Sequence, residues 1–175
     1  LGSVGTWYML DEMLDFFKTL LKTKPKAKFL FISQDNPNEI KRKAEEKGIS
    51  VEKILIQPAQ RNEVASLISC SDASVFFIKP LYSKKGSSAT KMGEIMNLGI
   101  PIICNDIGDQ KMILEMICPQ MIVNEFSDNE YQRAINELDK IDAENKQQFT
   151  NKAADYFSLE EGINKYLWIY KQILG

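Results

Sequence analysis

Short apolar runs alternate with segments of helical spacing along this chain, and that alternation constrains its fold more than any other feature. The runs cover residues 28–33, 51–57, 73–78, 101–104 and 121–123, and their near-continuous apolar character is typical of strands buried on both faces. Helical crossovers of this length between strands demand parallel pairing. The sequence therefore predicts an α/β fold, in which a doubly wound parallel sheet has helices on both faces and further helices are appended at the C-terminal end.

Length and charge limit the classes of function. A chain of 175 residues is long enough to bury one full core, which predicts a single domain. The formal net charge is −2, whereas a general nucleic-acid surface needs a basic patch, so nucleic acid is not an expected partner. The chain has no histidine, which removes histidine acid–base chemistry and most zinc sites. We therefore expect no bound metal.

The cysteines and the hydropathy pattern predict the cellular compartment of the protein. Cys70, Cys104 and Cys118 are odd in number, widely spaced and set among apolar residues. They are predicted to be buried thiols in a reducing environment, without a disulfide framework. No apolar run is long enough to span a membrane and no signal peptide opens the chain, so the expected location is cytoplasmic.

The first residues resemble the middle of an α/β unit. Residues 1–6 have the composition of a loop that follows a strand, and a helix is predicted at about residues 7–22. Because an α/β unit has a strand before such a loop, we expect the chain to be a fragment that lacks its first strand.

A second helix is predicted to begin at Pro37 and to end at Gly48. Asn36 is its expected N-cap, with proline at the first helical position and Glu39 at the third. The charged residues between Glu39 and Lys47 are expected to form a solvated face.

The segment after the last apolar run has a purely helical pattern. Capping boxes are predicted where Ser127 is followed by Glu130 and where Ser158 is followed by Glu161. Trp7, Trp168 and the last helix are expected to pack in the core or against another domain. The apolar stripe of that helix consists of Leu159, Ile163, Tyr166, Leu167, Tyr170, Ile173 and Leu174.

Residues 86–103 run from a Gly/Ser loop through a short helix into an apolar strand. Ser87 or Ser88 is the expected N-cap, and Gly99 suits the left-handed position after the last helical turn. The residues that recur at helical spacing, and that are predicted to face the core, are Met92, Ile95 and Met96.

Lys91 and Glu94 lie on a different face of the same helix, three residues apart. The start of a helix attracts anions through its free N–H groups and its dipole. Glu94 lies about 5 Å further along the axis, because each helical residue rises about 1.5 Å. Charged phosphates and ribose hydroxyls of a nucleoside diphosphate have a similar separation. The hypothesis is that this loop and helix hold a nucleotide.

The predicted sheet supports this placement. In a doubly wound sheet, ligands bind beyond the carboxyl ends of the strands, where the winding reverses. Residues 2–6 and 81–90 fall there, and both loops are rich in glycine or small hydroxyl residues. Their backbone N–H groups are therefore expected to approach a phosphate closely.

Residues 94–103 match a known hallmark position by position, Glu-x-Met-x-x-Gly-x-Pro-x-Ile. With the order of elements around it, this stretch resembles the nucleotide-sugar half of the GT-B glycosyltransferases. In particular, the chain is similar to the glycosyl transferases group 1 family, and within it to the family-4-like enzymes. The resemblance covers most of the chain and implies a Rossmann-like domain that binds a nucleotide-sugar donor.

The resemblance also implies roles for individual residues. Glu94 would accept hydrogen bonds from the ribose hydroxyls, and Lys91 would stabilise the leaving diphosphate. The base would lie near residues 58–61. The implied nucleotide-binding residues are Glu94, Lys91, Thr90, Ala89, Ser88, Gly2, Ser3, Gly5, Thr6 and Arg61.

Partners follow from the same resemblance. A nucleoside-diphosphate sugar is the implied donor, and no cofactor is needed. The acceptor site and any catalytic base belong to an N-terminal domain that this chain lacks, so the chain alone is expected to bind but not to turn over. A surface polysaccharide is the implied product, and any peripheral membrane association would come through the absent domain. One departure is Gly86, where the family has a second glutamate that touches the donor sugar.

The sequence is compatible with two alternative functions. The chain is also compatible with a non-catalytic nucleotide-binding or partner-binding α/β module, such as a regulatory domain. Receiver domains need clustered aspartates after the first strand, and this chain has no such cluster. The second alternative is half of a GT-B sugar-2-epimerase, but that chemistry typically uses histidine, which is absent.

Overall fold

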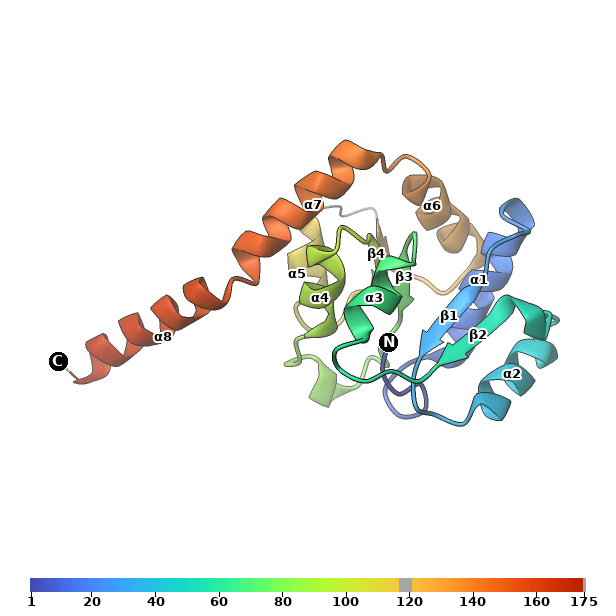
Figure 1. The fold of residues 1–175 in the computed structure, drawn as a ribbon, viewed down its shortest axis with the longest axis horizontal. Coiled ribbons are helices and arrows are strands. Elements are labelled where there is room, and N and C mark those ends of the chain that lie inside the picture. The colour runs from blue at the N-terminus through green and yellow to red at the C-terminus, as the bar shows by residue number, and fades with distance from the viewer. Residues whose placement is uncertain (117–120, 175) are drawn as a thin grey trace.

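The computed structural model describes residues 1–116 and 121–174, and it confirms the predicted alternation (Figure 1). The strands are β1 (Phe29–Ile32), β2 (Ile54–Gln57), β3 (Ser74–Phe76), β4 (Ile102–Asn105) and β5 (Ile122–Val123). The helices are α1 (Leu10–Thr23), α2 (Pro37–Glu46), α3 (Val64–Ser69), α4 (Lys91–Asn97), α5 (Gln110–Glu115), α6 (Asp128–Leu138), α7 (Ala143–Tyr156) and α8 (Leu159–Leu174). Two 3₁₀ turns, η1 (Val51–Lys53) and η2 (Tyr82–Lys84), complete the described elements.

The strands pair in parallel, as predicted, but they form two sheets instead of one. β1 pairs with β2, with Phe29 opposite Ile54. β3 pairs with β4, with Ser74 opposite Ile102, and β4 pairs with β5. Among the described residues, no ladder joins β1 to β3. Apart from this gap, the arrangement is the expected α/β sheet with helices on both sides.

The first helix begins later than predicted, at Leu10 and not at about residue 7. The backbone of Trp7 and Met9 is engaged elsewhere, because Lys79 N–H donates to Trp7 O and Met9 N–H donates to Phe77 O, both at 2.9 Å. These bonds hold residues 7–9 extended beside the end of β3, so the helix starts only after them.

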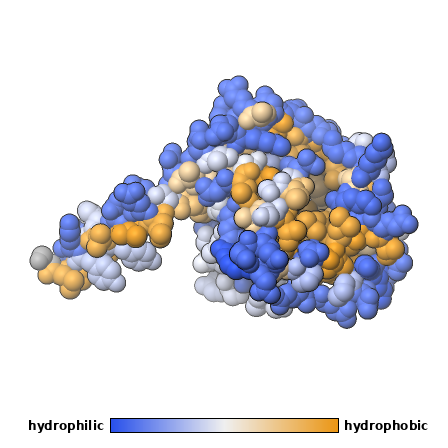
Figure 2. Space-filling model, viewed as in Figure 1, coloured by the Kyte–Doolittle hydropathy of each residue, from blue (hydrophilic) through white to orange (hydrophobic). Residues whose placement is uncertain are grey.

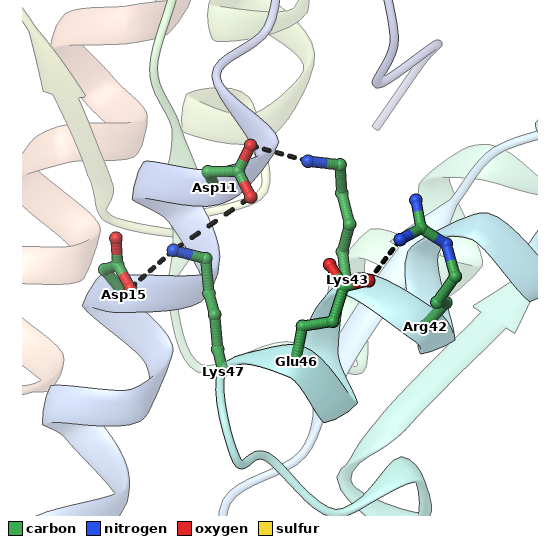
Figure 3. Close-up of polar contacts among 6 residues, drawn as sticks. All are labelled: Asp11, Asp15, Arg42, Lys43, Glu46 and Lys47. Carbon is green, nitrogen blue, oxygen red and sulfur yellow. Dashed lines mark hydrogen bonds and ion pairs between the residues drawn. The ribbon is translucent and has the colours of Figure 1, made fainter.

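The charged face of α2 contacts α1 (Figure 3). Lys43 lies 2.7 Å from Asp11, and Lys47 lies 2.7 Å from Asp15 and 4.0 Å from Asp11. The sequence predicted a purely solvated face here, which is wrong for these two lysines. The ion pair between Arg42 and Glu46 lies within α2, as expected for residues four apart.

The core lies between the sheets and the helices that cover them. The apolar positions predicted for α4, namely Met92, Ile95 and Met96, are all buried. On the opposite side, Tyr131 of α6 packs edge-on against Phe16 of α1, with ring centres 5.6 Å apart. The whole of β4 is buried, which is typical of a central strand with helices on both faces.

Helix α8 projects away from the rest of the chain (Figure 1), and none of its residues is buried. Its apolar stripe is therefore exposed, and so are Trp168 and, near the other end of the chain, Trp7. The core alternative for these residues is wrong. Packing against another domain stays a prediction.

The cysteines divide into two kinds. Cys104 is a buried thiol in β4, as predicted, and burial raises its pKa to about 12. Cys70 is exposed at the end of α3, so the prediction that it is buried is wrong. Cys118 lies outside the described residues.

The predicted helix caps are correct in part. Asn36 caps α2 with Pro37 at the first helical position, and Ser158 Oγ accepts from Glu161 N–H at 3.3 Å. Ser127 Oγ accepts from Glu130 N–H at 3.4 Å, but the Glu130 carboxylate accepts from Asn124 N–H instead of closing a capping box. None of the described helices is both long and apolar enough to cross a membrane.

Candidate functional site

Helix α4 is fixed in place by its glycines. A Cβ on Gly93 would lie 3.0 Å from the ring of Phe157, so this ring would have to shift by a few tenths of an ångström to admit a side chain. Gly99 has a φ of +69° and ends the helix in the left-handed conformation, as predicted. At both glycines α4 packs closely against α7, and this contact helps to position the helix that carries Lys91 and Glu94.

The start of α4 differs from the prediction. Thr90, and not Ser87 or Ser88, occupies the N-cap position, and its side chain accepts no capping hydrogen bond. Ser87 Oγ instead donates to Lys84 O at 2.8 Å within the preceding turn. Thr90 and Ser88 are exposed and Ala89 is half-buried, so the hydroxyls of this loop are open to solvent.

Lys91 points inward, under the end of β3. Its ammonium donates to Leu1 O at 3.2 Å and lies 3.7 Å from the ring centre of Tyr8 and 4.1 Å from that of Phe76. Burial lowers the pKa of Lys91 to about 7. The amine therefore lies between aromatic rings at the carboxyl ends of the strands, with a pKa near neutral pH.

Glu94 lies one turn further along α4 and points away from Lys91, toward the loop after β2. Its carboxylate forms an ion pair with Arg61. The Glu94 side chain is 32% exposed and the Arg61 side chain 82% exposed, so the pair lies at the surface. Two residues predicted to bind the same nucleotide thus contact each other in the free protein.

The first loop is held by an aspartate that the sequence reasoning missed. Asp35 accepts hydrogen bonds from Val4 N–H, from Ser3 Oγ at 3.0 Å and from Ser33 Oγ at 2.9 Å. Burial raises the pKa of Asp35, but the hydrogen bonds from Val4, Ser33 and Ser3 outweigh it and leave the pKa below its usual value. The signal that could have identified Asp35 is an aspartate just beyond β1 with a serine two residues before it, a pattern typical of turns closed by side-chain hydrogen bonds.

Two backbone N–H groups of that loop already donate hydrogen bonds within the protein. Gly2 N–H donates to Ile32 O at 2.9 Å, at the end of β1, and Gly2 has a φ of +95°. The Gly2 and Val4 amides are therefore occupied within the protein. The N–H groups of Ser3, Gly5 and Thr6 are the part of this loop that remains for a ligand.

A second missed residue ties the strand ends together. Asn105, buried at the end of β4, accepts from Ile78 N–H and donates to Ile78 O, both at 2.8 Å. In the next turn, Gly108 has a φ of +64°, and a Cβ there would lie 2.1 Å from Ser87 O. Asn105 therefore holds the backbone just after β3, and Gly108 packs against the loop that precedes α4, although neither was a predicted site residue.

The ten predicted residues lie around the carboxyl ends of β1, β2 and β3, but they are not in one pocket. A cavity of about 730 Å³ opens between β1 and β3, and of the ten only Gly2, Ser3 and Lys91 line it. Glu94 and Arg61 lie outside it. In the described part of the chain, no cluster of three or more Cys, Asp or Glu residues could hold a metal ion.

The family model of the glycosyl transferases group 1 matches residues 1–156. The chain belongs to this family. The family expected from the resemblance in the sequence is thus confirmed. No curated protein has a significant match to the chain.

Solved structures of glycosyltransferases share the fold. A mutant of the Thermobaculum terrenum O-GlcNAc transferase matches with a TM-score of 0.62 and 18% identity, over 83% of this chain and 28% of that one. WaaG, a glycosyltransferase involved in lipopolysaccharide biosynthesis, matches with a TM-score of 0.62 and 15% identity, over 84% of this chain and 38% of its own. The chain therefore spans well under half the length of either structure.

Proposed function

We propose that this chain is the donor-binding half of a glycosyltransferase and holds a nucleoside-diphosphate sugar at the carboxyl ends of β1, β2 and β3. The observation that carries the proposal is Glu94. Its carboxylate stands on a helix fixed by Gly93 and Gly99, at a place reached from solvent, and its partner is the highly exposed Arg61.

The ion pair is a suitable resting state for such a carboxylate. An exposed pair contributes about 0 to 1 kcal/mol, so ribose hydroxyls can replace the guanidinium at little cost. Arg61 then becomes free to contact the base or a phosphate, because it follows β2 at the same edge of the sheet. The Glu94–Arg61 contact would thus keep both groups beside the proposed nucleotide.

The diphosphate would lie over Lys91 and the two loops. Ser3, Gly5 and Thr6 offer backbone N–H groups, and Ser88, Ala89 and Thr90 offer the exposed turn before α4. A desolvated ammonium is attracted strongly to a phosphate, because the low local dielectric strengthens the interaction. Lys91 would then stabilise the charge that develops on the leaving diphosphate.

Calorimetric titration with UDP, GDP and ADP tests the proposal. We expect one of the three to bind, and Glu94→Gln to weaken its binding by about tenfold or more, the loss expected for charge-assisted hydrogen bonds. Glu45→Gln is the matched control, because Glu45 is an exposed glutamate on α2, away from this edge. Absence of binding by all three nucleotides, or equal affinities of Glu94→Gln and the control, would contradict the assignment.

The acceptor side belongs to the proposal as well. We propose that an N-terminal domain outside this sequence binds the acceptor and that the exposed apolar stripe of α8 packs against it. The relevant support is the number of large apolar residues that α8 exposes, including Leu159, Tyr166 and Trp168. Hydrogen exchange of the α8 amides should be slower in the longer protein than in the 175-residue chain, and sugar transfer should require the longer protein.

We further propose a growing surface polysaccharide as the acceptor and the cytoplasm as the location. The structural similarity to WaaG, a glycosyltransferase of lipopolysaccharide biosynthesis, supports this choice of acceptor class. Transfer assays with the longer protein, using polysaccharide fragments and peptides side by side, separate the two acceptor classes. Transfer to peptides alone would contradict the proposal.

A further inference from the structure

The turn that follows β3 has an apolar tip between lysines. Residues 79–85 read Lys-Pro-Leu-Tyr-Ser-Lys-Lys, and the 3₁₀ turn η2 lies within them. Tyr82 is 89% exposed and Leu81 is 43% exposed. Single apolar residues on a surface are ordinary, but neighbouring ones that project together indicate an interaction site.

Trp7 extends this tip across a second segment of the chain. Lys79 N–H donates to Trp7 O at 2.9 Å, and Lys79 Nζ donates to Thr6 O at 3.1 Å. The Lys84 ammonium lies 4.1 Å from the centre of the Trp7 ring, and Trp7 is 43% exposed. The two segments therefore form one surface. We call it the η2 surface, and it consists of Trp7, Lys79, Leu81, Tyr82, Lys84 and Lys85.

The η2 surface lies on the outer side of segment 7–9, whereas Lys91 lies on the inner side. Consecutive side chains of an extended segment point to opposite sides. The Tyr8 ring accordingly contacts the ammonium of Lys91, and the Trp7 ring contacts that of Lys84. The η2 surface is thus distinct from the place proposed for the diphosphate, and the nucleotide does not account for it.

The charge of this region is positive. Residues 73–93 contain four lysines and no aspartate or glutamate. The loop that packs on Ser87 through Gly108 contains Asp106, but this carboxylate lies 3.8 Å from Lys111. On a chain whose net charge is −2, a local group of three exposed or half-exposed lysines attracts an anionic partner.

Helix α8 also exposes large apolar residues, which Figure 2 shows along its length. Its charges are balanced, because Glu160 and Glu161 accompany Lys165 and Lys171. An anionic partner would therefore gain little there from electrostatic attraction. Of these two exposed apolar surfaces, the η2 surface is the one that combines apolar side chains with an excess of positive charge.

An anionic lipid bilayer fits both properties of the η2 surface. Tryptophan and tyrosine rings are favoured at the level of the lipid head groups, where one side of the ring is apolar and its polar edge is wet. Lysines beside them are attracted to anionic head groups. An acidic protein would also attract the lysines, but a stable protein interface needs a broad area, which a projecting turn does not offer.

We propose that the η2 surface docks this chain on an anionic lipid bilayer, with Leu81 and Tyr82 among the head groups and the three lysines beside them. A short apolar tip and a few lysines are weak signals individually, and together they give reversible binding. The sequence predicted membrane association only through another domain, whereas this surface belongs to the chain itself. The inference does not rest on nucleotide binding.

Tryptophan fluorescence locates the docking surface. The chain has two tryptophans, so Trp168→Phe leaves Trp7 as the reporter, and Trp7→Phe leaves Trp168 on α8. Vesicles of phosphatidylcholine with about 30% phosphatidylglycerol are compared with phosphatidylcholine alone. We expect the anionic vesicles to shift the emission of Trp7 to shorter wavelength and to leave that of Trp168 unchanged. An unchanged Trp7, an equal shift with neutral vesicles, or a shift at Trp168 instead would overturn the proposal.

Co-sedimentation with the same vesicles tests the lysines and the tip. Lys84→Gln combined with Lys85→Gln should lower partitioning onto the anionic vesicles about tenfold or more. The matched control, Lys165→Gln combined with Lys171→Gln, removes the same charge from α8 and should bind like the parent. Tyr82→Ser should also weaken binding, and this side chain is too exposed to be needed for folding.

Two results of the sedimentation experiment would contradict the docking surface. Equal losses in the two lysine pairs would mean that only the overall charge matters. Binding to soluble polyglutamate without binding to either kind of vesicle would indicate an acidic protein as the partner.

Discussion

The ammonium group of Lys91 lies 3.7 Å from the ring centre of Tyr8, which belongs to the segment that pairs with the end of β3. Two parts of the chain some eighty residues apart in sequence therefore meet at this amine. Stacking over an aromatic ring favours the charged form, but burial is the larger effect and lowers the pKa of Lys91 to about 7. The lowered pKa of Lys91 should make both the stability of the protein and its binding of nucleotides depend on pH.

Stability should rise with pH because of Lys91. Between about pH 7 and pH 10.5 the unfolded chain carries a proton on this amine and the folded chain does not. The free energy of unfolding then increases by up to about 1.4 kcal/mol per pH unit in that window. Lys91→Met should flatten this dependence in chemical denaturation measured from pH 7 to pH 10. Lys41→Met, at an exposed position of α2, should leave it unchanged.

Nucleotide binding should take up a proton near pH 8. A diphosphate beside Lys91 favours the charged amine, so its pKa rises on binding and up to about one proton is absorbed. Calorimetry in buffers of different ionisation enthalpy measures this number. Lys91→Met should abolish the uptake. The same proton uptake in this variant would place the diphosphate away from Lys91.

Asp35→Asn should loosen the first loop. The carboxylate accepts three hydrogen bonds, from Val4, Ser3 and Ser33, and its loss leaves these donors poorly paired. We expect a loss of about 1 to 3 kcal/mol in the free energy of unfolding, and faster amide exchange at Val4. Because the folded pKa of Asp35 lies below its usual value of 3.8, its contribution is present above that value and is lost as pH falls further. Equal stability of variant and parent at pH 7 would contradict this role.

Gly108→Ala should destabilise the protein by roughly 2 kcal/mol or more, because it combines left-handed strain with a steric clash. The new Cβ would lie 2.1 Å from Ser87 O, so the loop before α4 must move. Gly86→Ala is a matched control in that loop, since no atom lies within 4 Å of a Cβ there. Thermal unfolding of both variants checks the difference. We also expect weaker nucleotide binding in Gly108→Ala alone.

The hydrophobic pattern was sufficient to predict the order of strands and helices and the buried face of α4. Those features depend on local periodicity, which the sequence displays directly. The start of α1 was predicted three residues early, because the extended pairing of Trp7 and Met9 with the end of β3 is a tertiary contact. Cys70 and the α8 stripe were misplaced for a related reason. An apolar neighbourhood in sequence does not say which surfaces the rest of the fold covers.

The sequence by itself determined the family and the placement of Glu94 and Lys91 at the carboxyl edge of the sheet. The motif of residues 94–103 and the alternation of strands and helices can both be recognised from the order of residues alone. Only the tertiary structure decided that these two side chains diverge, one toward Arg61 and the other beneath Tyr8. It also decided that Asp35 and Asn105 hold the strand ends, and that a cavity of about 730 Å³ separates β1 from β3. Side-chain partners and empty volumes depend on distances between segments that are remote in sequence. Spacing along one chain does not encode those distances.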